Sequence, residues 1–219
     1  METLRYSSAS SGSQTTFTNT SPPTTIVWDQ NSMTNATLYV GGHATYQVRT
    51  ASKGTRTILQ DSFGETAARI DLRSILPDLV LLPRSTRGKS IRLRKWLYDT
   101  KNRAAQYPGD VDIRYEPRRR LSTLMQSSKG TYLWMATPTH RLALYDSSCL
   151  ESPIASFIPS TSRSKPAIVI APDVEVDQVE IVLAVLVLEQ RLRLQEKQLL
   201  VASGVDQLAR YAFAGHAQE

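Results

Sequence analysis

The stretch Ile181-Val182-Leu183-Ala184-Val185-Leu186-Val187-Leu188 decides the fold, because it holds no polar residue and lies between Glu180 and Glu189. A helix without a polar face is stable only where protein surrounds it on every side. Eight apolar residues in a row are also far fewer than the roughly 20 that a membrane span requires. The stretch therefore predicts a buried core helix enclosed by β-strands. The side chains expected to pack this core are those of Ile181, Leu183, Leu186 and Leu188.

The chain before this helix consists of short β-branched and aromatic runs separated by turn residues, which is typical of β-strands. Gly41-Gly42 lies between two such runs and predicts a hairpin turn, because both glycines accept a positive φ. Strands in such number and at such short spacing indicate a sandwich or a barrel. The predicted strands span residues 25–29, 36–40, 44–49, 55–61, 66–72, 79–82, 90–97, 111–115, 121–126, 131–136, 141–145, 154–158 and 167–171, with loops over 103–109 and 160–166.

Length and composition predict a single folded domain. The chain has 219 residues, of which 41% are hydrophobic, enough for one sizeable core. We expect a disordered Ser/Thr-rich tail over 1–23, a domain over 24–202 with its central helix at about 177–200, and a C-terminal extension over 203–219. Asp177 and Glu180 have capping-box spacing at the helix start. Gly204 predicts the helix end, with a short last helix over 205–213.

Cysteine usage and the N-terminal residues indicate a cytoplasmic protein. The single Cys149 cannot form an internal disulfide, which favours a reducing compartment. Residues 1–25 lack the apolar run of a signal peptide, and no transmembrane segment is predicted. Peripheral attachment to a membrane is compatible with both observations.

Three stretches of the second half resemble a known family. Gly130-Thr131-Tyr132-Leu133-Trp134 is similar to its Gly-x-x-Tyr-x-Trp strand, and Leu142-Ala143-Leu144-Tyr145 with Pro153-Ile154-Ala155-Ser156-Phe157 is similar to its next two strands. Residues 177–193 resemble its closing apolar helix. The family is the fungal DUF6593 family, whose fold is related to the Tubby C-terminal and LURP-one-related domains. The resemblance covers about residues 24–197 and is looser in the N-terminal half.

The resemblance implies a mostly β (α+β) fold, namely a closed antiparallel barrel of about twelve strands threaded by the C-terminal apolar helix. A closed barrel leaves no exposed sheet edge, and a buried helix fills a lumen too wide for the side chains of the strands alone. The charged insertion between Pro83 and Pro117 is less typical of the family.

Motifs for catalysis are missing from the sequence, so we expect no enzyme, no cofactor and no metal site. Gly88-Lys89-Ser90 resembles the end of a P-loop, but Pro83 occupies the position of its first glycine and supplies no amide. There is no Gly-x-Ser-x-Gly elbow. His43, His140, His216 and Cys149 have no metal-ligand spacing. A site assembled from distant strands is the alternative that sequence leaves open.

Positive charge is the strongest indication of function, since the net charge is +6 and many basic residues fall between 84 and 120. Alternation over residues 91–94 predicts a strand with two arginines on its outer face, while Trp96 and Tyr98 could lie at headgroup depth or in the barrel wall. Related Tubby-type domains bind phosphoinositides, so the resemblance implies an anionic phospholipid headgroup as partner. The candidate binding residues are Arg87, Lys89, Arg92, Arg94 and Lys95.

Three alternatives stay open for the basic and amphipathic segments. A solvated basic face with no specific ligand is the commoner explanation of such a cluster. Single-stranded nucleic acid could stack on Tyr107, Tyr115 and Trp96, although no nucleic-acid motif supports this. The leucines of residues 191–200 could bind a partner protein in a scaffold role, or pack back onto the domain. We expect a non-enzymatic module that recognises an anionic membrane surface.

Overall fold

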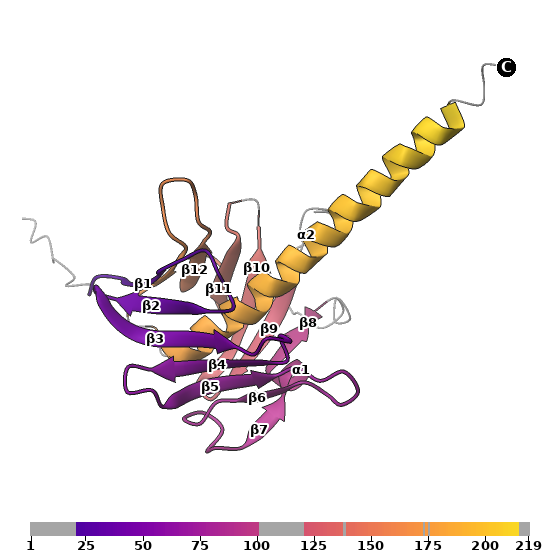
Figure 1. Cartoon of the computed structure of the whole chain (residues 1–219). Coiled ribbons are helices and arrows are strands. Elements are labelled where there is room, and N and C mark those ends of the chain that lie inside the picture. The colour runs from indigo at the N-terminus through magenta and orange to yellow at the C-terminus, as the bar shows by residue number, and fades with distance from the viewer. Residues whose placement is uncertain (1–20, 101–120, 138, 173, 175, 215–219) are drawn as a thin grey trace, which may run out of the picture.

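The computed structural model describes residues 21–100, 121–137, 139–172, 174 and 176–214. Within these ranges the chain forms one thirteen-stranded sheet and two helices (Figure 1). The strands are β1 (Thr24–Trp28), β2 (Ala36–Val40), β3 (His43–Thr50), β4 (Arg56–Asp61), β5 (Thr66–Asp71), β6 (Leu79–Leu81), β7 (Ser90–Arg92), β8 (Leu97–Asp99), β9 (Leu121–Ser127), β10 (Gly130–Ala136), β11 (Leu142–Asp146), β12 (Ala155–Ile158) and β13 (Ala167–Ile170). The helices are α1 (Leu93–Trp96) and α2 (Gln178–Ala214). The predicted loop over 103–109, the strand over 111–115 and most of the predicted N-terminal tail lie outside the described residues.

Most of the predicted strands are confirmed, because alternation and turn residues mark their positions clearly. Eleven of them have observed bounds within one residue of the predicted bounds. The hairpin at Gly41-Gly42 is also confirmed: the two glycines have φ of 57° and 83°, and Val40 pairs directly with His43. Positive φ at both central residues gives a turn whose twist matches that of the flanking strands.

The prediction of a closed barrel of about twelve strands is wrong, because the sheet is open. Its strand order is β7-β6-β5-β4-β3-β2-β1-β13-β12-β11-β10-β9-β8, and every pair is antiparallel. Thirteen strands that alternate in direction leave the two edge strands, β7 and β8, pointing the same way. An antiparallel pair therefore cannot join them. Among the described strands, β7 pairs only with β6 and β8 only with β9.

The short helix α1 separates these two edge strands and corrects the prediction of one strand over 90–97. In a continuous strand, Trp96 would share a face with Arg92 and Arg94. A helical turn instead brings positions three apart onto one side. Leu93 and Trp96 are accordingly both buried, at 2% and 0% exposure, while the side chains of Arg94 and Lys95 point outward. Burial of a tryptophan thus outweighs strand alternation.

Helix α2 confirms the prediction of a buried core helix. Every side chain from Ile181 to Leu188 is at most 7% exposed, and the same core cluster includes Trp28, Trp134 and Phe157 from the strands. Figure 1 shows the first part of α2 lying among the strands and its later turns running out beyond them. No helix among the described residues is both long and apolar enough to cross a membrane.

The start of α2 matches its prediction in part. Asp177 caps the helix, because its carboxylate accepts a hydrogen bond from the amide of Val179 at 2.9 Å. Glu180 does not complete the capping box. Its carboxylate instead accepts a hydrogen bond from the hydroxyl of Ser85, on the loop that follows β6.

Ion pairs hold α2 where it leaves the core. Glu189 is 1% exposed and accepts hydrogen bonds from Arg141 at 2.9 Å and from Arg193 at 2.7 Å, and Arg141 also binds Glu196. The predicted helix end at Gly204 is wrong, since α2 continues to Ala214. A glycine within a helix costs only about 1 kcal/mol relative to alanine, which flanking helix formers can offset.

Candidate functional site

The five basic residues predicted to bind an anion are all exposed, but the structure divides them into two groups. Arg87 and Lys89 lie on the loop between β6 and β7, whereas Arg94 and Lys95 lie on α1. Arg92 is the last residue of β7, between the two groups. The predicted set therefore comes from a loop, the end of a strand and a short helix.

Contacts with α2 show how far apart the two groups lie. The β6–β7 loop reaches Glu180 through Ser85, while Arg94 on α1 lines a pocket together with Arg191. From the helical rise per residue, positions 180 and 191 are roughly 16 Å apart along α2. The two groups therefore lie beside different turns of α2.

The β6–β7 loop has a tightly folded backbone. Arg87 and Gly88 both adopt positive φ, of 53° and 75°, and the amide of Gly88 donates a hydrogen bond to the carbonyl of Pro83 at 3.2 Å. The chain after Lys89 enters strand β7 and not a helix. The Gly88-Lys89-Ser90 segment consequently lacks the helix N-terminus on which a P-loop binds phosphate.

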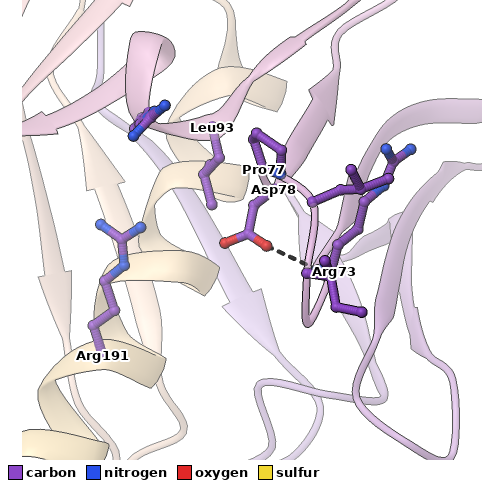
Figure 2. Close-up of a pocket in the computed structure, with 8 residues that line it drawn as sticks. Arg73, Pro77, Asp78, Leu93 and Arg191 are labelled. Carbon is purple, nitrogen blue, oxygen red and sulfur yellow. Dashed lines mark hydrogen bonds between the residues drawn. The ribbon is translucent and has the colours of Figure 1, made fainter.

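Arg94 of the α1 group lines a pocket. A pocket of about 390 Å³ lies where the loop over residues 72–78, α1 and α2 meet. Its basic side chains come from three distant positions in the sequence, Arg73, Arg94 and Arg191, and its single acidic residue is Asp78. With three arginines and one aspartate, the lining carries a formal charge of +2. Figure 2 shows the Arg191 side chain rising from α2 toward the space beside Leu93 and Asp78.

Asp78 holds the loop of the pocket in place. Its carboxylate accepts a hydrogen bond from the backbone amide of Arg73 at 2.8 Å, drawn as the dashed line in Figure 2. Its carbonyl accepts another from the amide of Leu93, the first residue of α1, also at 2.8 Å. These two bonds fix the loop against α1, so the position of Arg73 relative to Arg94 is set by the backbone.

Arg191 differs from Arg141 and Arg193, which both bind the carboxylate of Glu189, in having no direct hydrogen-bond or ion-pair partner among the described residues. Within the part of the chain that the structure describes, its guanidinium makes no hydrogen bond or ion pair. Burial lowers the pKa of this guanidinium, and the carboxylates of Asp78 and Asp99 oppose the shift from a distance. Arginine nevertheless stays charged in proteins. A half-buried cation that faces a pocket and makes no direct hydrogen bond or ion pair favours an anion as ligand.

An apolar loop tip lies at the rim of the same pocket. Ile75 is 93% exposed and Leu76 is 59% exposed, and both line the pocket beside Arg94. Two neighbouring exposed apolar side chains beside a pocket form a small contiguous patch, which is a feature of binding surfaces.

The two aromatic residues after α1 do not form a headgroup belt. Trp96 is completely buried in the main core, so its predicted position at headgroup depth is wrong and its position in the wall of the fold is confirmed. Tyr98 packs against a second cluster on β9–β11, and its hydroxyl accepts a hydrogen bond from Gln126 at 3.3 Å. Tyr107 and Tyr115 lie outside the described residues.

The described histidines and the cysteine lie in separate parts of the fold. His43 begins β3, the imidazole Nδ1 of His140 lies 3.0 Å from the Thr139 hydroxyl, and Cys149 lies in the turn after β11. Among the residues that the structure describes, no three His, Cys, Asp or Glu side chains gather closely enough to hold a metal ion. His216 lies outside them.

Sequence reasoning missed Arg73 and treated Arg191 only as part of an amphipathic helix. No local pattern relates residues 73, 94 and 191, because three separate segments meet only in the folded chain. One signal was available: Arg191 follows the apolar run by three positions, so it lies on the helix while still near the core.

Comparison with known proteins yields a family and one distant structure. A model described as "Family of unknown function (DUF6593)" matches residues 31–194. Among curated proteins, nothing matches. An X-ray structure of a protein from Arabidopsis thaliana is 12% identical over 78% of this chain and 93% of that chain, with a TM-score of 0.42.

Proposed function

The chain belongs to the DUF6593 family, whose function is unknown, and we propose that it is a binding module for phosphate groups on anionic membranes, foremost phosphoinositides. The proposal places the ligand phosphate in the pocket lined by Arg73, Arg94 and Arg191. Arg92 and Lys95, which flank Arg94 in sequence, add attraction to a surface of negative charge. The role is recognition without catalysis.

The observation that carries this proposal is the unpartnered guanidinium of Arg191. Arg141, which leans on the same helix, binds two carboxylates, from Glu189 and Glu196. Arg191 is held half-buried without such a carboxylate among the described residues. A phosphate in the pocket would supply the direct partner that Asp78 and Asp99 do not provide, through charge-assisted hydrogen bonds, which are stronger than neutral ones.

Vesicle co-sedimentation tests the proposal with matched charge variants. We expect wild-type protein to bind vesicles containing phosphatidylinositol phosphates and to be released by salt, since exposed charge pairs are screened. Arg94→Gln and Arg191→Gln should each weaken binding about fivefold, the effect of losing one cation near an anionic surface. Arg163→Gln removes the same charge from the exposed β12–β13 loop and serves as the control.

The results separate a pocket from general attraction. Equal weakening by Arg163→Gln and Arg191→Gln would contradict the pocket, because it would show that only net charge matters. Displacement by a soluble inositol phosphate but not by a single-stranded oligonucleotide would favour a lipid headgroup over nucleic acid. Thermal melting of each variant distinguishes lost binding from lost folding.

A protein-interaction role is the second candidate, favoured by the exposed side of α2. Leu192 packs into the core, but Leu194, Leu199 and Val201 are 60%, 62% and 61% exposed. Such side chains would suit the groove of a partner chain. A folded wild-type protein that binds no anionic vesicle would leave this scaffold role as the better account.

We also propose the source, the related domains and the cellular location that the sequence resemblance implied. A fungal source, a relation to Tubby C-terminal and LURP-one-related domains, and a cytoplasmic location with peripheral membrane attachment would all suit a lipid-recognition module. Their support is the similarity of residues 130–134, 142–145, 153–157 and 177–193 to the family pattern.

A further inference from the structure

The loop over residues 72–78 presents apolar side chains beside the arginine pocket. Ile75 is the most exposed large apolar residue of the described chain at 93%, followed closely by Phe63 at 90%. Next to Ile75, Leu76 is 59% exposed, and Leu72 at the start of the loop is 38% exposed. The loop therefore carries a compact apolar tip.

Two hydrogen bonds fix the base of this loop. Asp78 accepts one hydrogen bond from the amide of Arg73 and another from the amide of Leu93, both at 2.8 Å. The first bond closes the base of the loop, and the second fastens that base to α1. Ile75 and Leu76 are thus displayed on a fixed base.

Charge next to the tip identifies its partner. Arg73 and Arg94 line the same pocket as Ile75 and Leu76, and Asp78 is the acidic residue among the lining side chains. Apolar groups bordered by cations match the boundary of an anionic bilayer, where phosphates lie above hydrocarbon. A protein surface would have to provide both an apolar cleft and a ring of acids.

We propose that Ile75 and Leu76 form a wedge that enters the hydrocarbon boundary of an anionic bilayer while Arg73, Arg94 and Arg191 contact the phosphates. This inference rests on the proposed function and deepens it, because it defines which end of the molecule faces the membrane. Charge draws the protein to the surface, and insertion of the wedge slows its release.

Polar substitution of the wedge tests its contribution. Ile75→Ser with Leu76→Ser should lower the vesicle partition coefficient at least about tenfold, because two apolar side chains no longer leave water. The matched control is Phe63→Ser. Phe63 lies in the β4–β5 turn, and β5 separates that turn from the 72–78 loop by roughly 20 Å. The control should bind vesicles as the wild type does.

Fluorescence quenching measures insertion directly. The native tryptophans, Trp28, Trp96 and Trp134, are each 0% exposed, so they give a constant background. In Ile75→Trp, brominated acyl chains should quench the new indole and its emission should shift to the blue. In Phe63→Trp, bound to the same vesicles, the new indole should remain unquenched.

The outcomes distinguish this inference from the function on which it rests. Quenching at position 75 alone, with weaker binding by the serine double variant, supports the wedge. Wild-type sedimentation with anionic vesicles without quenching at position 75 overturns the wedge and leaves the proposed function standing. Equal quenching at positions 63 and 75, or unchanged binding by the serine variant, also overturns it. Failure of the wild type to bind anionic vesicles overturns both.

Discussion

Glu180 and Glu189 are carboxylates on one helix that are equally buried and have different partners. Each is 1% exposed. Glu189 is bound by the guanidinium groups of Arg141 and Arg193, whereas Glu180 accepts a hydrogen bond from Ser85 at one oxygen and has no hydrogen-bond partner at the other among the described residues. Burial raises the pKa of Glu180, opposed by the Ser85 and Ser127 hydroxyls and reinforced by Asp177.

This difference predicts opposite effects of the same substitution. When the pKa of an acid is higher in the folded protein than in the unfolded one, the fold loses stability as the pH rises from the unfolded-state pKa to the folded-state pKa. In Glu180→Gln the amide oxygen can still accept the hydrogen bond from Ser85. The free energy of unfolding of this variant should therefore equal that of the wild type at about pH 4 and exceed it at about pH 8. Glu189→Gln should cost about 3 kcal/mol at neutral pH, because it breaks a buried ion pair. Urea unfolding at both pH values measures each effect.

A Glu180→Gln variant that is less stable than the wild type at high pH would contradict this account. It would mean that the ionised carboxylate is stabilised by groups outside the described residues. The Glu189→Gln variant provides the contrast, because the same substitution there removes a carboxylate that two arginines bind.

Leucines along α2 contribute differently to the free energy of unfolding, depending on whether the sheet covers them. Leu186 is 1% exposed within the core, whereas Leu194, two turns later, is 60% exposed. Leu186→Ala should lower the free energy of unfolding by about 2–5 kcal/mol, the usual cost of a cavity. Leu194→Ala should change it by less than about 0.5 kcal/mol. Chemical denaturation measures both, and comparable losses would show that Leu194 is covered in solution.

The strands and the core helix could be predicted from the sequence, because each has a pattern that extends over several residues. The short helix α1, which interrupts a run of alternating residues, could not. Alternation and turn residues marked β1–β6 and β9–β13, and eight apolar residues marked the buried part of α2. The four residues of α1 are too few to show a helical period. Its presence is explained by the burial of Leu93 with Trp96, which depends on the core they enter.

The turn of helix also bears on the closed barrel that the family resemblance implied. As one strand, residues 90–97 would leave twelve described strands, an even number that permits antiparallel closure. As two strands separated by α1, they give thirteen and an open sheet. The arginine pocket was equally beyond prediction, since residues 73, 94 and 191 meet only after the sheet has curved around α2.

The open sheet predicts uneven protection of the backbone. Strands β7 and β8 each pair on one side only, whereas β1 and β13 pair on both sides. Amides without a ladder partner exchange readily with solvent. Hydrogen exchange followed by mass spectrometry should show faster exchange in residues 90–99 than in 24–28 and 167–170. Equal protection in the three segments would indicate that the edges are paired in solution.

The position of α2 at the end of the strand series has a consequence for biosynthesis. Thr24 pairs with Ile170, and the helix that fills the sheet follows both strands. While the chain is being synthesised, the strands leave the ribosome before the helix that covers their apolar side chains. Domains usually fold as units, and apolar surface exposed during synthesis promotes aggregation. Nascent chains that stop short of the helix should therefore depend on chaperones, and the sheet acquires its packed core only after α2 has been synthesised.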